Sequence, residues 1–301
     1  MNQEHHITVC ICTYKRPELL KRLLSKIEEQ KTEDLFDYSI VIVDNDKLES
    51  AQETVTDFAK QSQIDISYYI EPEQNIAMAR NKAIKNAKGD FIGLIDDDEF
   101  PENQWLLNLY KAINHYKADG ILGPVVPYFE IEPPQWVLKG QFFNRPSHPS
   151  GCVLDWTSTR TGNALLKKEL FKKEQQWFNP TFGSGGEDRD FFRRMISEGR
   201  VFIWYNEALV YETVPPNRWY KRILIKRALL RGKMALNSAN SRPLSVIYSI
   251  FAIVIYSCCL PIFFVFGAHI FMKYLIKDCD HIGKVAAFLG IDLVTEKYIG
   301  V

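Results

Sequence analysis

The chain has 301 residues, of which 46% are hydrophobic and 25% are charged. This length is enough for one large α/β domain with an appendage and a core of its own. Lysine plus arginine equals aspartate plus glutamate, 37 each, so the net charge gives no reason to expect a nucleic acid partner.

The six cysteines form no CxxC pair and show no metal-ligand spacing, which indicates a reducing compartment. Cys10 and Cys12 alternate within a predicted strand and would share one face, as small core residues do. The first apolar run, residues 7–12, is too short for the hydrophobic region of a signal peptide. We therefore expect the catalytic part to remain in the cytoplasm.

Short strands and helices alternate through the first hundred residues. The periodicity predicts strands at 7–13, 38–43, 66–70 and 90–95, and helices opening at Pro17, near 50–61 and at 76–87. Alternation with short links is typical of a parallel, doubly wound sheet, whose ligands bind at the carboxyl ends of its strands. A GxGxxG motif does not follow the first strand, which argues against a dinucleotide-binding domain.

Three aspartates, Asp96, Asp97 and Asp98, end the fourth of these strands. Carboxylates this close raise one another's pKa unless a cation or several donors compensate. Hard divalent ions bind carboxylate oxygens and bridge them to substrate phosphates, so a metal-diphosphate site is one interpretation. The other is a solvated acidic turn that opens the helix after Pro101.

A second acidic motif follows the irregular middle of the chain. Residues 127–149 are rich in proline and aromatic residues, and a loop of this length is usually functional or mobile. Further on, glycines at 183–186 lead into Glu187 and Asp188 and an apolar helix. These carboxylates either cap the helix, or one of them faces a pocket. Short strands are expected at 160–166, 201–205 and 208–211.

The C-terminal third carries a basic block beside an apolar run. Residues 213–277 contain no Asp or Glu, and their basic residues gather in the first half, which favours an anionic membrane surface over a nucleic acid. The spacing predicts a helix over 217–237, with an interfacial stripe formed by Trp219, Ile223, Leu230 and Met234.

The apolar run, residues 243–272, exceeds the roughly 20 residues needed to span a bilayer. Pro261 divides it, so a kinked span, a re-entrant hairpin and a buried core hairpin are the alternatives. The preceding basic residues favour an N-terminal domain on the cytoplasmic side, although lysines after the run weaken the case for a simple crossing. Residues 284–301 are expected to form a short amphipathic helix.

Several separated motifs, in their order and spacing, resemble an inverting family-2 glycosyltransferase with a GT-A fold. They are the strand-turn at 9–17, the strand end Val41-Ile42-Val43-Asp44-Asn45, the segment Asn75-Ile76-Ala77-Met78-Ala79-Arg80-Asn81, the aspartate triplet, and Gly185-Gly186-Glu187-Asp188. The resemblance covers roughly residues 7–235, and this conjunction is far more specific than any one motif. It is nearest to bacterial glucosyltransferases of succinoglycan, exopolysaccharide or lipopolysaccharide synthesis.

The resemblance implies a nucleotide-sugar donor, with a UDP-sugar expected, and Mn²⁺ or Mg²⁺ as cofactor. Asp98 would bind the metal, and Asp44 would accept a hydrogen bond from the uracil ring. Arg80 is explained equally well as a salt bridge to an acidic strand end. The residues implied to face the donor are Thr13, Tyr14, Arg16, Asp44, Asn75, Arg80, Asn81, Asp96 and Asp97.

The catalytic base implied by the resemblance is Asp188, with Glu187 and Asp190 as competitors. Many relatives carry a histidine metal ligand where this chain has Glu212, which is either a replacement ligand or a surface glutamate. The Gly162-Asn163 turn resembles the family's acceptor-side strand, and an ordinary tight turn is the alternative.

The QxxRW signature of processive synthases is incomplete, since Pro215 takes the place of its glutamine. We therefore expect transfer of a single sugar. The expected fold is α/β, with a GT-A, Rossmann-like, mostly parallel sheet flanked by helices and a C-terminal membrane-associated helical segment. Its expected parts are a catalytic domain at 1–215, a basic interfacial helix at 216–242, a transmembrane or re-entrant segment at 243–276 and a tail at 277–301.

The expected function is non-processive, inverting sugar transfer at the cytoplasmic face of the inner (cell) membrane. The acceptor would be a glycan or a lipid-linked glycan in bacterial surface polysaccharide synthesis. One alternative is an inactive glycan-binding or scaffold protein with the same fold. The other is a sugar-phosphate nucleotidyltransferase, although its glycine-rich phosphate loop is missing after the first strand.

Overall fold

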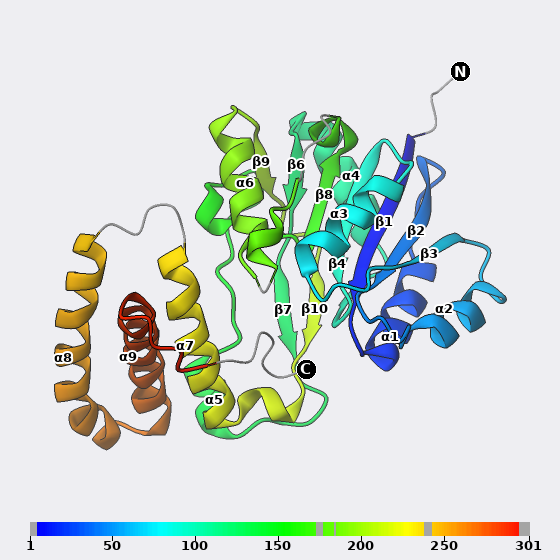
Figure 1. Ribbon diagram of the computed structural model, residues 1–301. Coiled ribbons are helices and arrows are strands. Elements are labelled where there is room, and N and C mark those ends of the chain that lie inside the picture. Colours follow the sequence, from blue (N-terminus) through cyan, green and yellow to red (C-terminus); the bar gives the residue numbers. More distant parts are fainter. Residues whose placement is uncertain (1–4, 173–176, 184, 238–242, 295–301) are drawn as a thin grey trace. The chain divides into compact units, whose positions relative to one another are not determined.

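The computed structural model describes residues 5–172, 177–183, 185–237 and 243–294 (Figure 1). The chain forms two compact units. The first contains the residues up to Tyr128 together with Arg145–Thr213, and the second contains Phe129–Asn144 and the residues from Val214 onward.

A seven-stranded sheet in the order β3-β2-β1-β4-β8-β6-β9 forms the centre of the first unit. Its strands are β1 (His5–Thr13), β2 (Phe36–Asp44), β3 (Asp65–Ile70), β4 (Phe91–Asp96), β6 (Gly120–Leu122), β8 (Asn163–Lys167) and β9 (Phe202–Trp204). The first four are parallel, β6 and β9 are parallel, and β8 runs antiparallel to both β4 and β6. The mostly parallel sheet expected from the sequence is confirmed.

Helices cover both faces of this sheet, as a doubly wound topology requires (Figure 1). They are α1 (Pro17–Glu28), α2 (Gln52–Ala59), α3 (Ile76–Asn86), α4 (Trp105–Tyr116) and α6 (Glu187–Ser197). One core cluster contains the buried faces of α1, α2 and α4, and the other contains those of α3 and α6. Strand β1 serves both, because Val9 belongs to the first cluster while Cys10 and Cys12 belong to the second. The shared face expected for these cysteines is confirmed.

A smaller sheet begins directly after the aspartate triplet. It has the order β5-β10-β7 and is formed by β5 (Glu99–Pro101), β10 (Val210–Thr213) and β7 (Val125–Tyr128). Strand β10 is antiparallel to β5 and parallel to β7. The acidic turn therefore connects two strands and does not open a helix; α4 begins only at Trp105. Short 3₁₀ helices lie at Trp156–Ser158, Lys168–Phe171 and Pro180–Phe182.

The second unit is helical. It contains α5 (Gln135–Gly140), a 3₁₀ helix at Pro216–Trp219, α7 (Lys221–Asn237), α8 (Pro243–Val265) and α9 (Ala268–Phe288). Trp219 lies outside α7, buried, with its ring 5.7 Å from that of Phe129, so its predicted place on an interfacial stripe is wrong. The 3₁₀ helix that contains Trp219 precedes α7, so Trp219 does not follow the periodicity of that helix.

The apolar run forms a helical hairpin whose break differs from the expected one. Helix α8 continues through Pro261, and the chain turns at Gly267, whose φ of 114° lies in the region that favours glycine. Within the described residues, one helix, Leu244–Val265, is long and apolar enough to cross a membrane, and 17% of its most apolar window is buried. Helix α9 ends at Phe288, so it takes in the first residues of the predicted tail helix. Residues 295–301 of that tail lie outside the described part.

Candidate active site

The carboxyl ends of β1, β2 and β4 meet at one edge of the large sheet. The parallel register places Thr13 opposite Asp44 and Cys12 opposite Asp96. Residues from three separated motifs of the sequence are thereby brought to adjacent strand ends, as ligand sites in open α/β sheets require.

Arg16 and Thr13 hold the aspartate triplet in place. The Thr13 hydroxyl donates to Asp97 at 2.9 Å, and Arg16 donates to Asp97 at 3.0 Å and to Asp98 at 3.1 Å. Burial raises the pKa of Asp97, and Arg16 opposes that shift. Asp97 is thus tied to the turn after β1, and Asp98 pairs with the same arginine.

Asp44 is fully buried and orders the turn after β2. Its carboxylate accepts from the backbone nitrogens of Asp46 and Ala51, at 3.0 and 2.8 Å, and from the Tyr68 hydroxyl at 2.9 Å. Tyr14 is half-buried in the neighbouring turn, where the Lys15 ammonium lies 5.0 Å from its ring centre.

Two asparagines join α3 to the segment that leads into α6. Asn75 caps α3 by accepting from two backbone nitrogens, and its amide donates to the Pro180 carbonyl at 3.0 Å. Asn81 exchanges two hydrogen bonds with the backbone of Phe178, at 2.7 and 2.9 Å. Both side chains fix the approach of the second acidic motif.

Arg80 connects the two acidic motifs. It is 7% exposed, donates to Asp96 at 2.8 Å and forms a second ion pair with Glu187. The interpretation of Arg80 as a salt bridge to an acidic strand end is confirmed. Burial raises the pKa of Glu187 to about 7, since Arg80 offsets only part of the desolvation and Asp188 adds to the rise.

The first turn of α6 presents three carboxylates in different surroundings. Glu187 is buried against Arg80, and Asp190 is held by Arg193 and Arg194 at 3.0 and 2.9 Å. Asp188 is half-buried and accepts from the Arg189 backbone nitrogen at 2.7 Å. In the described part of the chain, no basic side chain forms an ion pair with Asp188.

Glu99, Arg145 and Glu212 form a buried charged group beside the triplet. Arg145 pairs with Glu212 and lies 3.7 Å from Glu99. Glu99 is 1% exposed; one of its oxygens accepts from the Asp96 backbone nitrogen at 3.0 Å, and the other has no hydrogen-bond partner. Burial raises the pKa of Glu99 well above its usual value. Glu212 is 6% exposed, so the interpretation as a surface glutamate is wrong.

Sequence reasoning missed Glu99 and Arg145. The signal for Glu99 was present, because it directly follows the three aspartates. Arg145 lies in the proline- and aromatic-rich stretch, and no local pattern distinguishes it there.

The donor set at this edge fits a hard divalent ion shared with a substrate. Among the described residues, no group of three or more His, Cys, Asp and Glu side chains is arranged to hold a metal. Mg²⁺, however, is often held by one or two carboxylates together with substrate phosphates. Asp98 and the Asp96 side chain, which is 40% exposed, supply such oxygens, and the Glu99 oxygen without a hydrogen-bond partner lies in the same acidic group.

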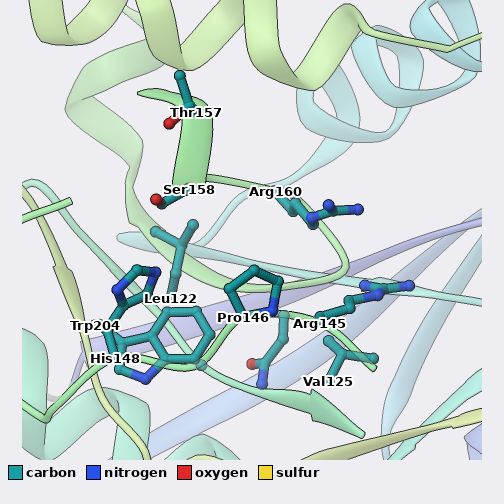
Figure 2. Close-up of a pocket in the computed structure, with 11 residues that line it drawn as sticks. Leu122, Val125, Arg145, Pro146, His148, Thr157, Ser158, Arg160 and Trp204 are labelled. Carbon is teal, nitrogen blue, oxygen red and sulfur yellow. The ribbon is translucent and has the colours of Figure 1, made fainter. Parts of the chain in front are cut away.

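A separate cavity of about 210 Å³ lies beside this edge (Figure 2). Its polar lining includes Arg145, His148, Thr157, Ser158 and Arg160, and its apolar lining includes Trp204. Asn163, whose side chain bonds to Trp105, Pro124 and Ala208, closes one end.

Comparison with known proteins gives a family and a fold. Residues 8–175 match the model of glycosyl transferase family 2. The succinoglycan biosynthesis protein ExoM of Rhizobium meliloti (strain 1021) is 34% identical over 236 residues, which are 77% of this chain and 74% of that protein.

Two solved structures show the same fold. The mannosyltransferase PcManGT from Pyrobaculum calidifontis, in complex with GDP-Man and Mn²⁺, has a TM-score of 0.61 at 16% identity, with 96% of this chain and 88% of that chain covered. S. aureus TarS 1-349 in complex with UDP has a TM-score of 0.54 at 15% identity, with 96% and 94% covered.

Proposed function

The chain belongs to glycosyl transferase family 2, and from this premise we propose that it transfers one sugar from a nucleotide-diphosphate sugar to a glycan or lipid-linked acceptor, with inversion. The observation that carries the proposal is that the carboxylates of the site differ in whether an arginine pairs with them. Asp97, Glu187 and Asp190 are each held by arginines, whereas Asp188 is half-buried and has no such pair in the described residues.

On the donor side, the proposed nucleotide site follows the turns after β1 and β2. Tyr14 and Arg16 line it, Asp97 accepts hydrogen bonds from both Thr13 and Arg16, and Asp44 orders the adjacent turn. Asn75 and Asn81 shape its far side through their bonds to Pro180 and Phe178, and Arg80 does so through its ion pairs with Asp96 and Glu187. Arg16 places a positive charge beside Asp98, where a diphosphate needs compensation. A UDP-sugar is the proposed donor, and the bound UDP of the TarS structure supports this choice.

The proposed metal is Mn²⁺ or Mg²⁺, held by Asp98 with Asp96 and Glu212 as the neighbouring carboxylates. Mn²⁺ accompanies GDP-Man in the similar mannosyltransferase structure. When bound, such an ion neutralises the negative charge that develops on the departing diphosphate.

Asp188 is the proposed base. It removes the proton of an acceptor hydroxyl while that oxygen forms a bond to the anomeric carbon, and the bond from this carbon to the diphosphate oxygen breaks. Because the acceptor attacks from the face opposite the diphosphate, the configuration inverts and no covalent intermediate forms. The Glu187–Arg80–Asp96 ion pairs connect the first turn of α6 to the end of β4, and so position the base relative to the donor.

The proposed setting is surface polysaccharide synthesis at the cytoplasmic face of the cell membrane. The name of the relative ExoM, a succinoglycan biosynthesis protein, supports the pathway class. The candidate span Leu244–Val265 supports membrane association. With one such helix in the described residues and an incomplete QxxRW signature, single-sugar transfer is proposed.

The experiment that tests the function is calorimetric binding of UDP, GDP and dTDP to the full chain in detergent, with and without Mn²⁺. Metal-dependent binding of UDP, weakened in Asp98→Ala, is the expected result. Anomeric analysis of the transferred sugar by NMR then tests inversion. If no nucleotide binds in detergent or in lipid, the chain is a scaffold that has kept the fold.

A further inference from the structure

The cavity beside the active edge has a cationic lining. Two arginines, a histidine and two hydroxyl side chains contribute to it, and among the residues that the structure describes no Asp or Glu does (Figure 2). Its volume of about 210 Å³ lies below the roughly 300–1,000 Å³ of sites for larger organic ligands. Such a space admits one small polar group or one ring.

The two arginines of the cavity differ in how far their charge is compensated. Arg145 is paired with Glu212 and lies 3.7 Å from Glu99. Arg160 is exposed, and no carboxylate among the described residues forms an ion pair with it. Its guanidinium therefore lacks a fixed counter-charge of its own.

The surroundings of Arg160 are positive on balance. Partial desolvation by the surrounding cavity wall, together with Arg145 and Arg189, lowers the pKa of Arg160, whereas Asp188 and Glu212 raise it by less. An anion placed in the cavity would relieve the repulsion between these cations, and charge-assisted bonds from arginine to carboxylate or phosphate are among the stronger hydrogen bonds in proteins.

Arg160 lies on the segment that leads into β8, beside the carboxylates at the end of β4. Gly162, two residues on, packs so closely against Glu99 that a Cβ there would lie 2.5 Å from its carboxylate oxygen. The strand that follows pairs Asn163 with Ile95, one residue before Asp96. Asp188 is also near enough to influence the pKa of Arg160. A group bound in the cavity would thus belong to a molecule that reaches Asp188.

We propose that this cavity binds an anionic group, a carboxylate or a phosphate, carried by the sugar acceptor, with Arg160 as its principal ligand. Ser158 and His148 provide further polar groups, and Trp204 forms the apolar wall on which the His148 ring packs, 5.2 Å between ring centres. This inference rests on the proposed function and deepens it, since it names the charge class of the acceptor.

The test uses the full chain in detergent with the donor site saturated by UDP and Mn²⁺. Inorganic phosphate, glucuronate and glucose are titrated calorimetrically into the wild type, Arg160→Gln and Arg160→Lys. Arg200→Gln is the matched control, because Arg200 is also a surface arginine but pairs with Asp119 away from the cavity. Binding of UDP is measured first for every variant.

Saturable binding of phosphate or glucuronate, without comparable binding of glucose, is the expected result. Arg160→Gln should weaken it by about tenfold or more, since a charge-assisted bond is worth at least that factor. Arg160→Lys should retain part of the affinity, and Arg200→Gln should leave it unchanged. Tighter phosphate binding assigns the anion to a phosphate of the acceptor, and tighter glucuronate binding assigns it to an acidic sugar.

Two outcomes would overturn the inference while UDP still binds. One is equal affinity for glucose and the anions, and the other is anion binding that Arg160→Gln leaves unchanged. Loss of UDP binding in the wild type would instead contradict the proposed function, so the two failures are distinguishable.

Discussion

At the scale of single residues, the first turn of α6 shows how neighbouring carboxylates acquire different chemistry. Asp190 bonds to two arginines of its own helix, and Glu187 bonds to Arg80 from α3. Among the described residues, Asp188 forms an ion pair with neither set of arginines, and it accepts a hydrogen bond from the Arg189 backbone nitrogen of its own helix. The sequence alone left the three as competitors, because their spacing does not say which arginine lies next to which acid.

Replacing Asp188 by Asn should lower the rate of sugar transfer by about 10²-fold or more, since a general base typically contributes 10² to 10⁴. UDP affinity should stay the same, because the change is isosteric and lies outside the nucleotide turns. Steady-state kinetics and calorimetry measure the two effects separately. Asp190→Asn is the control and should retain most activity. Equal rates for wild type and Asp188→Asn would assign the base elsewhere.

Glu187 should make stability depend on pH. Its pKa is about 7 in the folded chain against 4.5 for an ordinary glutamate, so its contribution to stability is full below about pH 4.5 and is lost as pH rises towards 7. The free energy of unfolding of the wild type, minus that of Glu187→Gln, should therefore fall between pH 4.5 and 7 and level off above. Denaturant unfolding of both proteins at several pH values measures this difference in the free energy of unfolding. A difference that stays constant would show that Arg80 keeps Glu187 ionised throughout.

Asn163 is a residue whose role only the fold reveals. It is 2% exposed, accepts from Trp105 at 2.8 Å, and donates to the carbonyls of Pro124 and Ala208 at 2.9 and 2.7 Å. The sequence showed the Gly162-Asn163 turn but not these partners, which lie 39 to 58 residues away in the chain.

Asn163→Ala should destabilise the first unit by about 2 kcal/mol or more, because it leaves the buried Trp105 donor and the buried Ala208 carbonyl without partners, at roughly 1–3 kcal/mol each, while the Pro124 carbonyl keeps its bond from the Val210 backbone nitrogen. Denaturant unfolding gives the value. The control is Asn108→Ala, which removes a surface bond to the Glu207 carbonyl and should cost less than about 1 kcal/mol. Similar losses for both variants would mean that water or a shift of the chain satisfies the groups around Asn163.

At the scale of elements, the sequence predicts a strand or helix correctly where the hydrophobic pattern that defines it is local. The strands and helices of the first hundred residues could be predicted because the hydrophobic periodicity agrees there with the glycine and proline residues that separate the elements. The β5-β10-β7 sheet was not, since its strands have three or four residues and pair across more than 80 positions of the chain. The sequence pattern predicts the break of the apolar hairpin at Pro261. A helix can contain a proline, however, when its neighbours satisfy the freed carbonyl, and α8 continues through Pro261. The chain turns instead at Gly267, which has a positive φ.

Helices α7 and α9 pack through two glycines. A Cβ on Gly232 would lie 2.0 Å from the Asp280 carbonyl oxygen, and one on Gly283 would lie 2.1 Å from that of Leu229. Ion pairs from Arg231 to Asp280 support the same contact, at 3.0 Å. The backbones therefore approach as closely as only glycine permits.

Gly283→Ala should lower the thermal stability of the helical unit even though alanine favours a helix by about 1 kcal/mol, because its methyl group cannot fit against Leu229. Circular dichroism of the detergent-solubilised chain during heating, with limited proteolysis of α7 to α9, measures the loss. Lys273→Ala, at an exposed position of α9, serves as the control and should change little. A gain in melting temperature for Gly283→Ala would show that the helices can separate at no cost.

At the scale of the whole molecule, equal totals of acidic and basic residues conceal an uneven distribution. In the sequence, the basic block of α7 favours binding to a membrane surface. In the structure, Arg231 and Lys233 form ion pairs with Asp280 and Asp292. Lys221 and Arg222 are exposed. Part of the block thus stabilises the helical unit itself and is not available to attract an anionic surface.

The apolar surface of α8 is therefore the main candidate for holding the chain on a membrane. Phe251, Val254 and Ile255 are 66%, 58% and 61% exposed, values that a water-facing helix rarely shows in a continuous patch. If lipid covers this face, two aspartates in place of Phe251 and Ile255 should each cost roughly 2.5–3.5 kcal/mol near the middle of a bilayer. Flotation with phospholipid vesicles in high salt, which screens the basic residues, measures the bound fraction.

The wild type and the control Phe251→Leu with Ile255→Leu should float with the vesicles, and Phe251→Asp with Ile255→Asp should remain largely in the soluble fraction. Binding of UDP should be the same in all three, because the nucleotide turns belong to the first unit. Flotation of the aspartate variant at the wild-type level would mean that another protein surface, and not lipid, covers α8. The exposed face would then be an interface for a partner, and, because high salt screens the basic residues of α7, other apolar residues would have to account for the vesicle binding.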